Sequence, residues 1–198
     1  MSEQLKNKRI GFGLTGSHCT YDLVYPQLQR LMDEGAKVIP IVSYTVRNVD
    51  SKFGKAEEHI EKIEEITKTR VISTMQEAEP LGPKQPLDCM VIAPMTGNSI
   101  SKFAHALTDS PVLMAAKATL RNRRPVALGI STNDALGLNG VNIMKLMSSK
   151  LIYFIPFGQD HPFKKPTSLV AKMDLLAPTI EKSLIEKQLQ PVIIPHSN

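Results

Sequence analysis

Short apolar runs alternate with amphipathic stretches along this chain, and the alternation limits the folds that are open to it. Arg9–Leu14 and Lys37–Val42 have the length and composition of strands, and residues 22–34 between them carry leucines at helical spacing. A strand, a helix and a second strand in this order are typical of a βαβ unit, which places parallel strands in one sheet with helices on its faces. The sequence therefore predicts an α/β fold.

The same pattern continues to the end of the chain. Residues 89–93 are apolar throughout, which is typical of a central strand buried on both faces. Further strands are predicted at 71–74, 126–130 and 151–155, and further helices at 56–67, 99–107, 112–120, 140–147 and 173–189. Pro178 marks a kink or a boundary of the last helix. Because no linker divides the sequence, we expect a single domain over residues 1–198, with residues 156–198 as a C-terminal loop and helix appended to it.

Composition argues against several classes of protein. No apolar stretch approaches the ~20 residues that a membrane helix needs, and the opening residues lack the apolar core of a secretory signal. The net charge of +5 comes from basic residues interspersed with acids, unlike the clustered charge of a nucleic-acid-binding surface. We therefore expect a cytoplasmic protein, with no membrane and no nucleic acid among its partners.

The cysteines and histidines predict neither a disulfide framework nor a metal site. Cys19 and Cys89 cannot build a disulfide framework, and we expect both to be buried free thiols. The positions of His59, His105 and His196 are not those of a metal site, so no metal is predicted.

The loops after the predicted strands are the places to look for a ligand, because ligands of open parallel sheets bind at the carboxyl ends of the strands. Residues 11–17 read G-x-G-x-x-G-S, and Thr15, Gly16 and Ser17 could hold a phosphate beside the following helix N-terminus. The alternative is a turn with a helix cap. Ser43 ends the second strand, where dinucleotide-binding folds place an acidic residue for the ribose, so this loop favours a phosphate of FMN or NADP.

The loop after the predicted central strand is the most informative of the three. Thr96, Gly97, Asn98 and Ser99 open a helix there, and capping of that helix is the simpler interpretation. Capping alone does not require the whole run of small and hydroxyl-bearing residues that begins at Ala93. Such a run leaves room for a flat ring and a phosphate together.

These loops resemble those of the flavoprotein family that includes FMN-containing cysteine decarboxylases and flavin prenyltransferases. The resemblance is carried by residues 15–17, Ser43, residues 93–99 and Asp109-Ser110, and it covers roughly residues 8–155. It implies a Rossmann-like, flavodoxin-type three-layer α/β/α sandwich with a mostly parallel sheet, which binds FMN and forms a homo-oligomer. The FMN-binding residues that it implies are Thr15, Gly16, Ser17, Ser43, Thr96, Gly97, Asn98 and Ser99.

Departures from the family argue against decarboxylase or prenyltransferase chemistry. The decarboxylases carry a catalytic histidine upstream of the central strand, whereas residues 79–88 contain none. They also use a cysteine in a later segment, whereas no cysteine follows Cys89. Of their Pro-Ala-Met-Asn segment, residues 130–133 keep only Asn133.

Residues 129–136 and 156–166 carry a narrower resemblance, to a subgroup of this family that acts in dipicolinate synthesis in spore-forming bacteria. It implies an oxidoreductase subunit that works with an A subunit in the mother cell, where dihydrodipicolinate is oxidised to dipicolinate. NADP would then be held by the A subunit. The alternatives are a non-catalytic partner that stabilises the A subunit, and a flavin-dependent decarboxylase or prenyltransferase.

The substrate of that reaction carries two carboxylates, for which cations and an amide are suitable partners. We expect Asn133, His161, Lys164 and Lys165 to contact it, with His161 as an acid–base candidate. The alternative is a solvated basic loop without a ligand. We also expect apolar residues of the helices within 99–120 to form contacts between subunits.

Overall fold

Five parallel strands form the centre of the sheet, in the spatial order β2-β1-β3-β4-β5. The computed structural model describes residues 4–196. The strands are β1 (Arg9–Leu14), β2 (Lys37–Val42), β3 (Cys89–Met95), β4 (Val126–Thr132) and β5 (Ile152–Phe154). Two short antiparallel strands, β6 (Phe157–Gly158) and β7 (Leu169–Ala171), extend the sheet beside the carboxyl end of β4. The predicted α/β fold with a mostly parallel sheet is confirmed.

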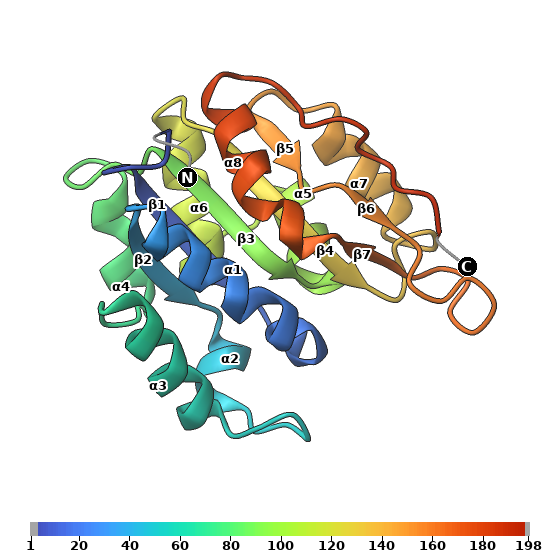
Figure 1. Ribbon diagram of the computed structural model, residues 1–198, viewed down its shortest axis with the longest axis horizontal. Helices are drawn as coiled ribbons and strands as arrows, with labels where there is room; N and C mark the ends of the chain where they lie inside the picture. Colours follow the sequence, from blue (N-terminus) through green and yellow to red (C-terminus); the bar gives the residue numbers. More distant parts are fainter. Residues whose placement is uncertain (1–3, 197–198) are drawn as a thin grey trace.

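Helices cover both faces of the sheet (Figure 1). On one face pack α1 (Tyr21–Asp33) and α8 (Leu176–Leu184), with α3 (Ala56–Thr67) beside α1. On the other face lie α4 (Met75–Ala78), α5 (Gly97–Ala104), α6 (Pro111–Arg121) and α7 (Gly140–Met147). The result is the predicted three-layer α/β/α sandwich.

The core is centred on β3, which is apolar toward both helical layers. Each of its residues is buried, as expected of a central strand. The chain contains no tryptophan, so aliphatic side chains supply most of the core, and the larger rings include Phe12, Phe154 and Phe157. The strands of the sheet are therefore fixed from both sides, and their carboxyl-end loops are held on a rigid base.

The end of the chain differs from the prediction. The expected helix at 173–189 is a 3-10 turn at Met173–Leu175 followed by α8, which ends at Leu184. Pro178 lies in the first turn of α8, where helical N–H groups lack intrahelical partners. The chain then turns back along β5, and the side-chain amide of Gln188 exchanges two hydrogen bonds with the backbone of Phe154. This pairing covers an edge of the sheet that a continued helix would leave open.

Three short segments and one cysteine also differ from the sequence-based expectation. β6 and β7 have too few residues for a periodic pattern to reveal them, and Ile72 contributes one parallel bridge to Ile41 rather than a strand. Cys89 is buried, and burial raises the pKa of its thiol to about 12. Cys19 is exposed, so the prediction that both thiols are buried is wrong. It lies in the 3-10 turn before α1, which buries its neighbour Thr20 instead.

Apolar residues of the helices within 99–120 serve mainly the core of this chain. Val112 and Leu113 are buried there, whereas Leu107 is 53% exposed. These helices therefore offer less free apolar surface than the sequence suggested. Within residues 4–196, no helix has the length and apolar content that crossing a membrane requires.

Candidate functional site

The loops after β1 and β3 are tied together at the carboxyl ends of these strands. The hydroxyl of Thr15 donates to the carbonyl of Pro94 at 2.8 Å and accepts from the backbone N–H of Thr96 at 2.9 Å. Tyr21, in the first turn of α1, donates its hydroxyl to the carbonyl of Thr15 at 3.1 Å. Because Thr15 is 1% exposed, its hydroxyl is committed to the protein and sets the spacing of the two loops.

A cavity of about 380 Å³ opens between these loops, and we call it the anion cavity. The residues at the N-termini of two helices line it, Thr96 for α5 and Ser110 for α6. Each of these side chains caps its own helix by accepting a backbone N–H at 3.3 Å. The free N–H groups of a helix N-terminus carry partial positive charge, which favours an anion.

Ser43 is the unusual member of the anion cavity. It precedes α2 (Tyr44–Asn48), yet its side chain makes no capping bond to that helix. Its Oγ atom is buried and has no hydrogen-bond partner among residues 4–196. A buried hydroxyl without a partner costs free energy, and a hydrogen bond to a ligand would offset that cost.

A cation also borders the anion cavity. Lys102, one turn into α5, lies with its Nζ atom 2.6 Å from Oδ2 of Asp109, and both side chains line the cavity. Gly16 lines it from the first loop, where an added Cβ would lie 2.9 Å from Cγ2 of Thr45. The hydroxyls and the helix N-termini of this set suit a phosphate, and its ammonium group is paired with the Asp109 carboxylate.

A second cavity, of about 560 Å³, lies beside the first, and we call it the β4 cavity. Thr96 and Asn98 line both, so the N-terminus of α5 separates them. Its walls also include residues 131–134 at the end of β4, and Ser17, whose hydroxyl donates to the carbonyl of Ser131 at 2.9 Å. The two cavities together follow the carboxyl ends of β1, β3 and β4.

A polar network under Gly97 holds the start of α5 against β4. The Asp134 carboxylate accepts from the hydroxyl of Thr132 and from the amide of Asn139, which in turn accepts from Asn142. A Cβ on Gly97 would lie 2.6–2.8 Å from atoms of three of these side chains, so only glycine fits. Asn139 and Asn142 were missed in the sequence because only the first residues of the loop after β4 were considered, whereas Asn139 ends that loop and Asn142 lies in the first turn of α7.

The sequence matches the family described as Flavoprotein over residues 1–172. The chain belongs to the flavoprotein family. It is 66% identical over 190 residues to the dipicolinate synthase B subunit of Bacillus subtilis (strain 168), covering 96% of this chain and 95% of that protein. These findings confirm both resemblances expected from the sequence.

Solved flavoprotein structures agree with this membership. The crystal structure of the dipicolinate synthase B subunit from Bacillus halodurans C superposes with a TM-score of 0.90 at 64% identity, covering 96% of this chain and 98% of that one. The FMN-dependent cysteine decarboxylase SpaF gives a TM-score of 0.64 at 18% identity, covering 91% and 97%. At that low identity the second match shows the shared fold alone.

The flavoprotein fold distributes the expected FMN residues over both cavities. Ser17 and Gly97 line the β4 cavity. The anion cavity holds the other six, of which two are shared: Thr15, Gly16, Ser43, Thr96, Asn98 and Ser99. Sequence reasoning missed Lys102, although its place one helical turn after Asn98 and Ser99 would have revealed it.

Three of the four expected substrate residues line the β4 cavity. Asn133, His161 and Lys165 lie there, whereas Lys164 is not part of the lining. The Nζ atom of Lys165 is 3.4 Å from Oδ2 of Asp160. Burial raises the pKa of that carboxyl, but hydrogen bonds and the lysine charge outweigh burial, so its pKa lies below the ordinary value.

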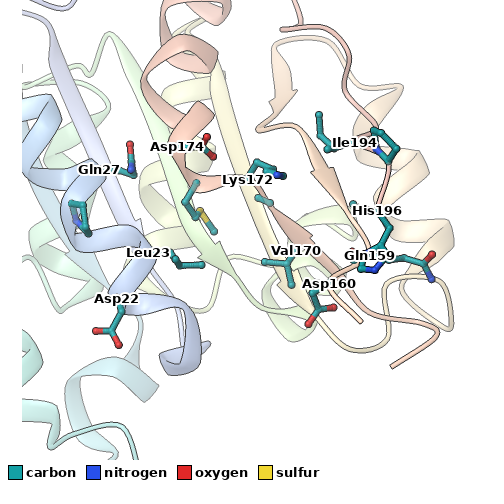
Figure 2. Close-up of a pocket in the computed structure, with 15 residues that line it drawn as sticks. Asp22, Leu23, Gln27, Gln159, Asp160, Val170, Lys172, Asp174, Ile194 and His196 are labelled. Carbon is teal, nitrogen blue, oxygen red and sulfur yellow. Dashed lines mark hydrogen bonds between the residues drawn. The ribbon is translucent and has the colours of Figure 1, made fainter. Parts of the chain in front are cut away.

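A third cavity, of about 550 Å³, adjoins the β4 cavity on the α1 side. Figure 2 shows Leu23 of α1 on one side of it, and Val170 of β7 and Ile194 of the C-terminal segment on the other. Leu23, Val170 and Asp160 line both cavities. The β4 cavity therefore has a mixed apolar and charged wall where the chain's C-terminal part meets α1.

A cluster of rings supports the turn between β1 and α1. The rings of His18 and His59 stack with their centroids 5.5 Å apart, and Nδ1 of His59 lies 2.7 Å from the hydroxyl of Tyr25. Burial lowers the pKa of both imidazoles, and the neighbouring His59 lowers that of His18 further. Both rings are therefore suited to remain neutral.

Proposed function

We propose that this flavoprotein binds FMN, with the phosphate in the anion cavity and the ring directed toward the β4 cavity. The observation that carries the proposal is the buried, unpartnered hydroxyl of Ser43 beside the N-termini of α5 and α6. The strand order supports it, because flavodoxin-like sheets of order 2-1-3-4-5 bind FMN where the order reverses between β1 and β3.

Each residue has a separate task in this proposal. Ser43 and Ser99 donate hydroxyl hydrogen bonds to the phosphate, and Lys102 offsets its charge. Thr15 holds the two loops at the spacing that the ligand needs. Gly97 lets the start of α5 pack on the Asp134 network, and Gly16 lets the first loop pack against Thr45.

We propose further that the chain acts with the A subunit of dipicolinate synthase in oxidising dihydrodipicolinate, as its similarity to the B subunit suggests. Loss of a hydride and a proton makes the dihydropyridine ring an aromatic pyridine. When bound, an oxidised flavin supplies a hydride acceptor, as NADP held by the A subunit also does. The expected setting is the cytoplasm of the mother cell, and the expected assembly includes a homo-oligomer.

This chain's residues at the β4 cavity have defined roles in that reaction. Lys165 contacts one substrate carboxylate and the Asn133 amide hydrogen-bonds to it. His161 lies on the same wall and accepts the ring proton. Lys164 does not line the β4 cavity, so it has no role in this proposal.

The absorption spectrum of the purified chain tests the flavin proposal. We expect the bands of an oxidised flavin, released as FMN on denaturation. Turnover of dihydrodipicolinate is then measured with the A subunit present and absent, and with and without NADP. A colourless protein that cannot be reconstituted with FMN would contradict the flavin site. Full turnover by the A subunit alone would instead make this chain a non-catalytic partner.

A further inference from the structure

The β4 cavity is poorly matched in charge to a dicarboxylate. Within residues 4–196, its lining has the carboxylates of Asp134 and Asp160, against one ammonium group, that of Lys165, and the imidazole of His161. The lysine is already paired with Asp160. A dianion that leaves water requires compensating cations, so this cavity by itself would meet one carboxylate and leave the second without a partner.

An exposed apolar surface borders the same cavity. Leu136 follows the cavity residues 133–134 closely, and Phe163 lies in the β6–β7 loop between His161 and Lys165. The surface, which we call the apolar rim, consists of Leu136 (55% exposed), Leu138 (91%), Val141 (75%), Met144 (56%) and Phe163 (94%). Exposed apolar side chains that gather beside a cavity are typical of sites of protein association.

Two hydrogen bonds join the two segments of the apolar rim. The backbone N–H of Leu136 donates to the carbonyl of Thr167 at 2.9 Å, and the hydroxyl of Thr167 donates to the carbonyl of Asn133 at 2.6 Å. The β6–β7 loop projects from the carboxyl end of the sheet (Figure 1). A protein that covers the rim therefore also reaches the mouth of the β4 cavity.

The charge at the mouth of the β4 cavity distinguishes between the proteins that could cover the apolar rim. A two-fold contact of the rim with a second copy would bring another Asp134, Asp160 and Lys165 to the mouth, and it would add no net positive charge. A different chain can add a cation without its own carboxylates. The missing charge therefore favours a different subunit.

We propose that the apolar rim docks the A subunit, which places an arginine or lysine at the mouth of the β4 cavity to bind the second carboxylate of the substrate. This inference rests on the proposed function. The substrate site is then shared: Lys165 and Asn133 of this chain meet one carboxylate, and the A subunit meets the other.

The docking surface is tested with the double variant Leu138→Asp/Val141→Asp. Both side chains are exposed, so the fold should tolerate the change, while two buried carboxylates should weaken binding of the A subunit by at least about 100-fold. Ile185→Asp is the matched control. Ile185 is 56% exposed and caps the end of α8. That end of α8 lies at the opposite end of the sheet from the β6–β7 loop (Figure 1).

The measurements are light scattering of the mixed subunits and flavin content of each variant. Wild-type affinity for the A subunit in the double variant would overturn the proposal, as would the absence of a complex with the wild-type chain. Loss of self-association with unchanged binding of the A subunit would also overturn it, because the rim would then be a contact between copies. Flavin content should stay unchanged, which separates this result from failure of the FMN site.

The shared site is tested by calorimetry with pyridine-2,6-dicarboxylate and pyridine-2-carboxylate. One added charged hydrogen bond predicts that the complex binds the dicarboxylate at least about tenfold more tightly than this chain alone, with little change for the monocarboxylate. Lys165→Met should weaken dicarboxylate binding by the complex. Equal dicarboxylate affinity of the chain and the complex would overturn the proposal. Unchanged dicarboxylate binding by the complex in Lys165→Met would also overturn it, because the whole site would then lie on the A subunit.

Discussion

The hydroxyl of Thr15 accepts a hydrogen bond from the backbone N–H of Thr96 at 2.9 Å. This bond joins the end of β1 to the start of α5 and thereby sets the width of the anion cavity, which both residues line. The hydroxyl also donates to the carbonyl of Pro94, so only a side chain with an O–H group can make both hydrogen bonds. The two loops that border the anion cavity are therefore positioned by contacts within the protein.

Thr15→Val should destabilise the protein and impair flavin binding together. Valine has nearly the same shape but leaves a buried N–H unpaired, which costs about 1–3 kcal/mol. Urea unfolding and flavin content measure the two effects. Thr179→Val is the control, because the Thr179 hydroxyl donates to the carbonyl of Leu175 at 2.7 Å and does not line the cavity, so its loss should leave flavin content unchanged. Normal flavin content in Thr15→Val would contradict the role of this bond.

Ser43→Ala should separate stability from binding. Without flavin, removal of a buried and unpartnered hydroxyl should leave the free energy of unfolding unchanged or raise it. With flavin, loss of a hydrogen bond to a charged phosphate should weaken FMN binding on the order of 10- to 100-fold. Ser110→Ala serves for comparison, since loss of a helix cap should cost about 1 kcal/mol even without flavin. A stability loss in flavin-free Ser43→Ala would show that the hydroxyl has a structural partner.

Lys102→Met should change the selectivity between FMN and riboflavin. The two flavins differ by the phosphate, so loss of the ammonium group should lower FMN affinity by about tenfold or more and leave riboflavin affinity unchanged. Titration of the flavin-free protein by fluorescence measures both constants. Lys117→Met, an exposed lysine on α6, is the matched control. Equal losses for the two flavins would mean that Lys102 acts through the fold.

Lys165→Met and Lys164→Met form a matched pair for the substrate end of the site. Lys165 lines the β4 cavity and its neighbour does not, so only the first change should raise the Michaelis constant for dihydrodipicolinate. Loss of one charged hydrogen bond predicts a rise of about tenfold or more. Steady-state kinetics with the A subunit present measure it, and flavin content should be unaffected in both. Equal effects of the two variants would indicate a general effect of loop charge.

Stability should fall as the pH falls below about 6.5, the ordinary pKa of an imidazole. The folded pKa values of His18 and His59 are lowered by burial, so in this pH range the unfolded chain binds protons that the folded chain does not. The stability that the two neutral imidazoles contribute is fully present above their pKa in the unfolded chain. It is lost as the pH falls toward their lower pKa in the folded chain. Thermal unfolding at pH 7.5 and pH 5.5 measures the loss. His18→Phe should reduce it, and an unchanged loss in that variant would exclude His18 as a source.

Local sequence patterns determined much of the fold and part of the site. The periods of apolar residues predicted the five parallel strands and most helices, because burial on one or both faces of an element imposes a spacing on neighbouring residues. Small and hydroxyl-bearing residues after β1 and β3 pointed to the edge of the sheet where the two cavities lie, since parallel strands present their carboxyl ends at one edge. The resemblance to flavoproteins depended on those same loops.

Tertiary packing alone decided which of these residues meet. Ser43, Lys102 and Ser110 come from three separate segments, and their convergence depends on the order of the strands and the depth at which each helix packs. The sequence likewise could not distinguish Lys165 from Lys164, or reveal that Cys19 is exposed, because adjacent residues in a loop or turn point in directions that long-range contacts select. Sequence periodicity reports the burial of a residue within its own element, whereas a site is built from distances between elements.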